Sequence, residues 1–588
     1  MALPPIYRIH PAIGIGRVGN ADRNTFFIGP ELPGRGPIGD ATVGTRVPNF
    51  KDGGNIKPQA ARFRIWEYVE KKGKYEASRE INLDQKDCVE LKWTVHLANR
   101  KASFFKFVRL TGEERAHPAG NRRNDAVVNR RTLEMDPLPR SIKGRNQAPV
   151  KFDKGSSSNP ANELWPNPAP SPAIEYLGEL RTDPAGRLIV LGGRGVASGR
   201  SGATLTDAFN NDGWFDDVSD GPVTASLTMK VGGKNKVVKV EPAWFMCGPP
   251  DFAPSIKHVV TLYDVLYDMA ARELTLPTNE AIYDTTLKGL ADINKEFKAA
   301  GSAKLSRYKP SFDEEIFPII RHGQEQIFVF EALKFVHGSL AKFAKLGDPS
   351  AAAAPDRQAL FNRLHPPGLA GPGGAKNMPL LNGDEYTDPT HKRHALTLTE
   401  TQFALMEQWV NGNFTAMSGP IPPPLPAAVI TPHGLDQAAL ENCIGGAFCP
   451  GIEVSWQIRN KKLFSAPFRI DHSAVTQYLG DTSGQIRAGH FSRQMAVPWH
   501  TDFLACKLQN GMGWWPAARP DIVYESKADF DNSPKKSKAW TRPSGANWPS
   551  GGQSPTRQEF VDNAHKLGIL RQNPQFYHVE GERNSSIP

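Results

Sequence analysis

The chain contains little cysteine, and this shortage excludes a fold built on disulfide bonds. Five cysteines are spread over 588 residues, whereas disulfide frameworks concentrate their cysteines in short chains. A reducing compartment is therefore the simplest expectation. The chain begins Met-Ala-Leu-Pro-Pro, which has neither the basic nor the apolar part of a secretory signal. We expect a cytoplasmic protein, with export outside the general secretory pathway as the alternative.

Long hydrophobic runs are also missing. No apolar stretch of the sequence reaches the roughly 20 residues that a membrane-spanning helix needs. Hydrophobic residues make up 39% of the chain and the mean hydropathy is −0.44, values that are typical of a soluble globular protein. The sequence therefore predicts no membrane span, and its length is enough for roughly two to four domains.

Sequence patterns for nucleotides, metals and nucleic acids are absent as well. No Walker loop is present, and the Gly-Ile-Gly at 14–16 lacks the third glycine of a dinucleotide fingerprint. His391 and His394 stand three apart and Cys443 and Cys449 six apart, without the further ligands that complete a metal site. The formal charge is +10, but no basic stripe with interleaved aromatics appears. We expect no nucleotide, metal ion or nucleic acid as a ligand.

Strand-like segments gather in the first part of the chain. Alternating apolar and polar residues at 62–69 and 92–97, and a short apolar run at 188–191, are typical of β-strands. Residues 145–170 are polar and rich in proline, serine and asparagine, which predicts a long surface loop. We expect a β-rich N-terminal domain at residues 1–255.

The middle of the chain has a helical period instead, because apolar residues recur every three or four positions. The predicted helices are residues 258–273, 282–299, 326–346 and 399–409. A proline-rich stretch at 421–426 predicts an extended connector. These patterns predict an α+β protein with a β-rich N-terminal part, a helical middle at 256–420 and a mixed C-terminal region at 421–588 that carries the site.

The most reactive side chains stand close together near the C-terminus. Asp502 lies four residues before Cys506, so that a helix presents both on one face, and Trp514 and Trp515 follow. A carboxylate, a thiol and electron-rich indoles are the groups needed for a protein-derived quinone, in which a cysteine is joined to an oxidised tryptophan. The alternative is an ordinary one, since a buried cysteine near tryptophan is more often part of a hydrophobic core.

Five stretches of the chain are more informative together than separately. They are Ile-His-Pro-Ala-Ile-Gly-Ile-Gly-Arg-Val-Gly-Asn at 9–20, Gly-Trp-Phe-Asp-Asp-Val-Ser-Asp-Gly-Pro-Val at 213–223, Pro-Pro-Asp-Phe-Ala-Pro at 249–254, Cys-Ile-Gly-Gly at 443–446 and the cluster at 502–521. In this order they resemble the bacterial lysine ε-oxidase and glycine oxidase family, the LodA/GoxA-like proteins. The resemblance runs from near the first residue to the C-terminal region, and the chain is identified as a member.

This resemblance implies an activity and a cofactor. Members oxidise the primary amine of an amino acid with O₂ and release a carbonyl product, ammonia and hydrogen peroxide. They carry cysteine tryptophylquinone, made from their own cysteine and tryptophan and installed by a separate flavoprotein. Cys506 matches the cysteine of that cross-link, and Asp502 matches the acid needed for maturation and assigned a part in catalysis. Members also form homo-oligomers, so the resemblance implies a dimer or tetramer here.

The tryptophan of the cofactor is the point at which this chain departs from the family. Members tend to carry a tryptophan shortly before a Leu-Gly pair near the C-terminus, but residues 560–568 read Phe-Val-Asp-Asn-Ala-His-Lys-Leu-Gly. Trp540 is then the best candidate for the cross-link to Cys506, since the Trp514-Trp515 pair is expected to pack beneath the site. If no tryptophan serves, the chain keeps the fold and binds an amino acid or peptide, or uses Cys506 and His565 in another oxidative reaction.

Three further residues are candidates for the substrate pocket. Cys443, Phe252 and Phe215 lie in the stretches that match the family, and Phe215 stands where tyrosine is expected in many relatives. Each has an ordinary alternative, because a buried thiol or phenylalanine is a common core residue. Pocket volume and one or two polar groups decide which amino acid such a site accepts.

Overall fold

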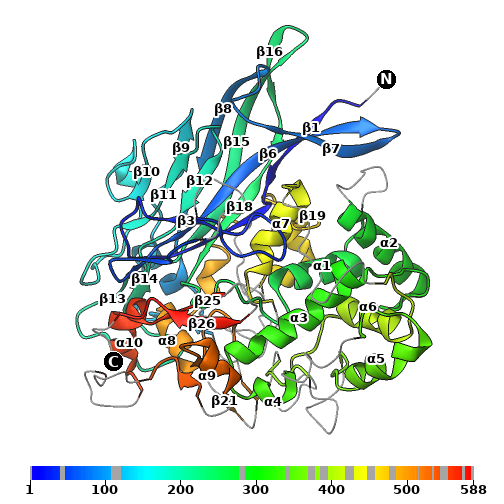
Figure 1. Ribbon diagram of the computed structural model, residues 1–588. Coiled ribbons are helices and arrows are strands. Elements are labelled where there is room, and N and C mark those ends of the chain that lie inside the picture. Colours follow the sequence, from blue (N-terminus) through cyan, green and yellow to red (C-terminus); the bar gives the residue numbers. More distant parts are fainter. Residues whose placement is uncertain are drawn as a thin grey trace.

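One large β-sheet and a group of helices make up most of the molecule (Figure 1). In that view the blue and cyan strands of the first part of the chain stand apart from the green helices of its middle, and the orange and red C-terminal elements lie below the sheet. The structure is a computed structural model that describes residues 3–39, 47–107, 121–276, 285–337, 345–368, 378–383, 395–416, 429–445, 457–475, 485–506, 508–509, 512–513, 515–532, 536–542, 548, 554–572 and 577–584.

Among the described residues, fourteen strands form the large sheet. They are β1 (Ile6–His10), β2 (Ile13–Arg17), β3 (Phe27–Ile28), β6 (Gln59–Lys71), β7 (Lys74–Ile81), β8 (Cys88–Val95), β9 (Arg140–Lys143), β10 (Val150–Asp153), β11 (Tyr176–Thr182), β12 (Leu188–Leu191), β15 (Asp220–Val231), β16 (Lys234–Val238), β17 (Val240–Glu241) and β18 (Ala243–Gly248). The main path is β10-β11-β12-β6-β2-β18-β15-β8-β9, and the remaining five strands pair at its sides. Neighbours in the sheet are mostly antiparallel, but β2 and β18 run parallel.

The centre of this sheet is packed on both faces, which explains the glycines at 14–16. Gly14 pairs with Phe245 of β18 and Gly16 with Cys247. A Cβ atom at Gly14 would lie 2.3 Å from the ring of Phe63, and one at Gly16 would lie 2.5 Å from the ring of Phe245. The two glycines therefore allow aromatic rings to cover β2 closely, and they take no part in a nucleotide loop.

Seven helices follow the sheet in the described residues between 262 and 441: α1 (Leu262–Arg272), α2 (Thr285–Ala300), α3 (Phe317–Glu325), α4 (Leu333–His337), α5 (Ala354–Phe361), α6 (Glu400–Val410) and α7 (Pro432–Glu441). A π-helical turn at Phe312–Ile316 leads into α3. Capping boxes begin α1 at Thr261 and α6 at Thr399, because each threonine exchanges hydrogen bonds with the third helical residue. The helices predicted at 258–273, 282–299 and 399–409 are confirmed.

Two local predictions are wrong. The segment 145–170 is not a continuous loop, because β10 lies within it and pairs with β11. The helix predicted at 326–346 is interrupted: a short 3-10 turn covers Gln326–Phe328, and α4 begins only at Leu333. The carbonyl oxygen of Val329 instead accepts a hydrogen bond from the backbone N–H of Asp521 over 2.6 Å. A tertiary backbone contact therefore replaces a helical one at this point.

The C-terminal region mixes short helices with two-stranded ribbons. Its elements are β19 (Phe464–Ala466), β20 (Arg469–Ile470), α8 (Trp499–Ala505), β21 (Leu508–Gln509), β22 (Met512–Gly513), β23 (Ile522–Val523), α9 (Lys527–Asp531), β24 (Lys538–Ala539), α10 (Arg557–Asn563), β25 (Ile569–Gln572) and β26 (His578–Gly581). Two small ribbons earlier in the chain are β4 (Lys51–Asp52) with β5 (Asn55–Ile56) and β13 (Ala197–Gly199) with β14 (Trp214–Asp216). A large mixed sheet beside separate helices confirms the α+β class, while the two boundaries between the three predicted domains stay predictions.

Candidate active site

Helix α8 carries Asp502 and ends directly before Cys506, and a strand far away in the sequence fixes its first turn. The residue before the helix is Pro498, which makes no side-chain cap. The cap comes from β14, where Oδ2 of Asp216 accepts a hydrogen bond from the backbone N–H of Trp499 over 3.0 Å. A carboxylate at a helix N-terminus satisfies a free amide and complements the helix dipole. The stretch at 213–223 therefore serves to position α8.

Asp216 is itself held by a buried lysine. Nζ of Lys101 lies 2.5 Å from Oδ2 of Asp216, and neither side chain has exposed surface. Burial lowers the pKa of Lys101, and the Asp216 carboxylate opposes that shift. Asn99 holds the same aspartate from another side, since its Nδ2 donates to the backbone oxygen of Asp216 over 2.8 Å. A buried ion pair thus lies directly before α8.

The acid is the fourth residue of α8, and the thiol belongs to the residue that caps its C-terminus. Asp502 is 3% exposed and Cys506 is 5% exposed. The backbone N–H of Cys506 donates to the backbone oxygen of Asp502 over 3.2 Å, and Sγ of Cys506 lies 3.5 Å from the same oxygen. The thiol is therefore turned back toward the turn that begins at Asp502. The structure brings the two residues within one helical turn, as their spacing predicts.

Arg519 connects the end of α8 to two indoles. Its Nε donates to the backbone oxygen of Phe503 over 2.7 Å, which satisfies one of the carbonyls that a helix C-terminus leaves free. The guanidinium carbon lies 5.0 Å from the ring centre of Trp515 and 5.6 Å from that of Trp540. At these distances a cation is attracted to the face of an indole. Arg519 therefore places a positive charge between two tryptophans beside α8.

Trp540 lies in an aromatic cluster that includes α8. Its ring centre is 4.7 Å from that of Phe252 and 6.3 Å from that of Phe503, which belongs to α8. Phe560 of α10 adds a further edge contact at 6.5 Å. Trp540 has no exposed surface. The structure thus brings two of the predicted site residues, Phe252 and Trp540, against the helix that carries the acid and the thiol.

The indole N–H of Trp540 meets the Leu-Gly pair of the C-terminal region. Nε1 donates to the backbone oxygen of Gly568 over 2.8 Å, although 28 residues separate the two in sequence. The same segment holds Phe252, whose backbone oxygen accepts from the N–H of Leu570 over 2.8 Å. Trp540 therefore lies in space beside the segment where the family resemblance predicts a tryptophan.

His565 lies in that segment, in a 3-10 turn at Ala564–Lys566, and it is half-buried. Burial lowers the pKa of His565 to about 4. His500 of α8 is buried and stacks on Trp499 with ring centres 3.6 Å apart. Burial lowers its pKa well below the usual range, and the nearby Lys101 adds to that shift. Two neutral imidazoles therefore lie near one another beside α8, and Nδ1 of His500 has no hydrogen-bond partner among the described residues.

Cys443 lines a small cavity next to the aromatic cluster. Residues 516–518 form part of its wall, and the polar side chains of the wall are Asp251, His258 and Asn442. The cavity volume is about 10 Å³, close to the space that one water molecule needs. The backbone oxygen of Ala518 accepts a hydrogen bond from the N–H of Phe252 over 2.9 Å. The Cys443 cavity and the Trp540 cluster are therefore neighbours.

Groups of opposite charge surround the Cys443 cavity. Burial raises the pKa of Asp251, and the nearby Arg17 opposes that shift. Nη2 of Arg17 donates to the backbone oxygen of Asn442 over 2.7 Å and lies 4.0 Å from Sγ of Cys443. Nδ2 of Asn442 has no acceptor among the described residues. Burial lowers the pKa of His258 to about 4, so its ring is neutral near pH 7. The wall offers a carboxyl group, an N–H donor and a thiol to a small polar group.

Phe215 lies apart from this cavity. It is 1% exposed on β14, and the guanidinium of Arg200 lies 5.1 Å from its ring centre. Neither Phe215 nor Phe252 belongs to the described wall of the Cys443 cavity. The next residue, Asp216, is the functional residue that sequence reasoning missed, because a cap 283 residues from its helix leaves no local signal. The sequence signal for Asp216 is its position in the stretch at 213–223, which resembles the family.

Several other predictions concern residues without a described position. His391, His394, Cys449 and Trp514 lie outside the described residues. Within the described part of the chain, no group of three or more histidines, cysteines and acids is arranged to hold a metal ion. Among the same residues, no helix is long and apolar enough to cross a bilayer.

Comparisons with known proteins agree with the resemblance seen in the five stretches. The model for the L-lysine epsilon oxidase N-terminal region matches residues 10–247, and the model for the L-lysine epsilon oxidase C-terminal domain matches residues 379–529. The L-lysine 6-oxidase of Marinomonas mediterranea is 30% identical over an alignment of 560 residues. The match covers 85% of this chain and 71% of that protein.

Solved structures give the same relationship. Two crystal structures from Marinomonas mediterranea, the L-Lys epsilon-oxidase and its Schiff base intermediate with L-Lys, match with a TM-score of 0.75 and 25% identity. The match covers 98% of this chain and 95% of each of those chains. The matched family models and this similarity along most of the sequence show that the chain belongs to the L-lysine epsilon-oxidase family and is an amino-acid oxidase.

Proposed function

We propose that this enzyme deaminates the primary amine of an amino acid with dioxygen. The balanced reaction consumes the amine, one O₂ and one water, and it gives a carbonyl product, ammonia and hydrogen peroxide. The relatives are named for the oxidation of L-lysine, and the grouping of an acid, a thiol and an indole around α8 supports the same class of reaction here.

The cofactor that we propose is cysteine tryptophylquinone, formed from Cys506 and Trp540. The observation that carries this assignment is the position of Trp540, which packs on Phe503 of α8 and donates its N–H to Gly568. That hydrogen bond turns the carbon edge of the six-membered ring away from Gly568. Cys506 supplies a buried thiol at the end of the same helix. The quinone would supply an electrophilic carbonyl that accepts the amine and then two electrons.

The chain's own residues divide the remaining work. We assign proton transfer to Asp502, both in maturation and in catalysis, because it is a buried carboxylate one turn from Cys506. Arg519 places a positive charge beside Trp540, where it would stabilise negative charge that develops on the ring. Asp216 and Lys101 act as positioning residues, since they fix the first turn of α8.

We propose the Cys443 cavity as the place where one small polar group of the substrate is held. The carboxyl group of Asp251 would accept hydrogen bonds from an amino group placed there, whereas Nδ2 of Asn442 would donate to a carboxylate oxygen placed there. Buried polar groups of this kind discriminate strongly, because a substrate that leaves them unpaired binds poorly. A separate flavoprotein for maturation and a homo-oligomeric state complete the proposal.

Intact-mass measurement with peptide mapping tests the cofactor. The protein is produced together with its maturation flavoprotein. Joining Cys506 to Trp540, with two oxygens gained and four hydrogens lost, adds about 28 Da. Trp540→Phe should abolish this gain. Trp548→Phe is the matched control, because it removes another buried indole whose N–H also donates to a backbone oxygen, and it should keep the gain. Asp502→Ala should abolish the gain if Asp502 serves maturation.

Two results contradict parts of the proposal. An unchanged mass, with Cys506 still alkylated after unfolding, excludes the quinone and favours amino-acid or peptide binding, or another oxidative chemistry near His500 and His565. A mass gain that survives Trp540→Phe excludes Trp540 as the partner, and the cross-linked peptide then identifies the tryptophan used.

A further inference from the structure

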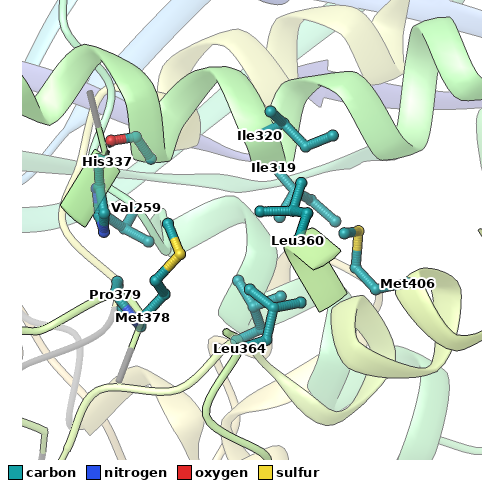
Figure 2. Close-up of a pocket in the computed structure, with 11 residues that line it drawn as sticks. Val259, Ile319, Ile320, His337, Leu360, Leu364, Met378, Pro379 and Met406 are labelled. Atoms are coloured by element: carbon teal, nitrogen blue, oxygen red, sulfur yellow. Dashed lines mark hydrogen bonds between the residues drawn. The ribbon is translucent and has the colours of Figure 1, made fainter. Parts of the chain in front are cut away.

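A second cavity lies in the helical middle of the chain and is almost entirely apolar. It is enclosed by α3, α5 and α6 together with α4 and the segment before α1, and Figure 2 shows side chains from these elements facing one space. The aliphatic wall includes Val259, Ile319, Ile320, Leu360 and Leu364. The thioethers of two methionines, 378 and 406, complete it. The cavity volume is about 30 Å³, room for about two water-sized spheres.

Among the described residues of this wall, His337 supplies the polar side chain, and its ring leaves few hydrogen-bond partners for a water molecule. Nδ1 lies 2.6 Å from the backbone oxygen of Gly323, which can only accept, so Nδ1 carries the proton. Burial lowers the pKa of His337 to about 4, so the ring is neutral near pH 7. Nε2, on the Pro379 side, has no partner with hydrogen-bond geometry among the described residues. Besides Nε2, the wall beside this ring offers the backbone oxygen of Pro379, so a water there would have at most these two partners, the lower end of the two to four that a buried water makes.

One short segment separates this cavity from the Cys443 cavity. Val259 lines the apolar cavity, whereas the preceding residue, His258, lines the Cys443 cavity. Their Cα atoms are about 3.8 Å apart, as in any trans peptide. The next residues extend the link, because the N–H of Gly445 donates to the backbone oxygen of Val260 over 2.9 Å. The two cavities therefore lie on either side of a single stretch of backbone.

We propose that the apolar cavity holds dioxygen on its way to the amine site. This inference rests on the proposed function, in which O₂ is the oxidant. Dioxygen is a small apolar molecule, and it gains mainly dispersion contacts, which polarisable methionine sulfur supplies well. The volume fits a diatomic molecule, and the lining leaves little reason for water to compete. A position one residue from the Cys443 cavity would hold O₂ beside the proposed substrate site without occupying the polar wall that the substrate needs.

Xenon is the direct probe, because it enters dry apolar cavities of this kind. Crystals of the matured enzyme pressurised with xenon should show a xenon peak between Val259, Leu360 and Met378. Val259→Leu and Leu364→Phe fill the cavity from two different walls. If one variant fails to fold, the other still tests the proposal. Leu398→Met is the matched control, since it changes a wall residue at nearly constant volume.

Steady-state kinetics at varied O₂ concentrations then test whether the cavity affects turnover. In a two-step exchange mechanism the amine and O₂ react in separate half-reactions. The filled variants should lose xenon and lower kcat/KM for O₂ by about threefold or more while kcat/KM for the amine stays unchanged. The control should match the wild type in both measurements.

Each contrary result has a distinct meaning. Absence of xenon in the wild type overturns the cavity assignment. Xenon binding with an unchanged kcat/KM for O₂ in both filled variants shows an inert void and also overturns the proposal. An enzyme that binds xenon but consumes no O₂ with any amine contradicts the proposed function, and with it dioxygen as the occupant, while the xenon peak still establishes a dry cavity.

Discussion

Replacing Asp216 by asparagine separates two tasks of one carboxylate, which caps α8 and neutralises Lys101. Asparagine keeps a side-chain oxygen that can accept the hydrogen bond from the N–H of Trp499, now 3.0 Å away. It carries no charge, however, and Nζ of Lys101 loses the anion that lies 2.5 Å away in a fully buried site. Destabilisation of Asp216→Asn should therefore come mainly from the unpaired lysine.

The expected magnitudes follow from burial. Removing one partner of a buried ion pair costs about 3–5 kcal/mol, whereas losing a helix cap alone costs about 0.5–2 kcal/mol. Asp216→Asn should fall in the first range, and Asp216→Ala should cost about 1 kcal/mol more because the cap is lost as well. The double variant Asp216→Asn with Lys101→Met should recover much of the loss, because an apolar replacement of both charges is often neutral.

Hydrogen exchange of the α8 amides measures the free energy of opening in this region, and the thermal midpoint measures the stability of the whole protein. The wild type, Asp216→Asn, Lys101→Met and the double variant form a cycle that isolates the interaction between Lys101 and Asp216. A cost below about 0.5 kcal/mol for Asp216→Asn would refute the reasoning, since that is the range of ordinary surface substitutions.

Three further outcomes are expected. Burial lowers the pKa of His258 and His337 from 6.5 to about 4, so the unfolded chain binds more protons in this window and the thermal midpoint should fall as pH drops from 6.5 to 4. Burial raises the pKa of Asp217 from 3.8 to about 7, so the wild type loses stability as pH rises through 7. The thermal midpoint of Asp217→Asn should therefore rise relative to that of the wild type between about pH 5 and pH 8. A difference between the two midpoints that does not change with pH would contradict this sign. Arg519→Met removes the hydrogen bond to Phe503 and the charge beside Trp540, so fewer chains should show the mass gain; an unchanged fraction would exclude a role in maturation.

Predictions that depend on neighbours within a few residues agree best with the structure. The helix of α6 was predicted at 399–409, and its capping box uses Thr399 and Gln402, three residues apart. Asp502 and Cys506 are four apart and do share one turn of α8. The helix predicted at 326–346 was wrong because Val329 pairs with Asp521, nearly two hundred residues later in the sequence. Local patterns are reliable only where distant backbone groups do not compete for the same hydrogen bonds.

The sequence by itself determined the fold class and the family, and it predicted that Asp502 and Cys506 share one helical turn, because composition, periodicity and short stretches of side chains carry that information. Only the tertiary structure decided what surrounds them. It placed Asp216 at the start of α8, Arg519 between two indoles, and Trp540 against Gly568. These contacts join residues that the chain order keeps apart, and they form because burial forces charged and polar groups to find partners wherever the folded backbone brings them.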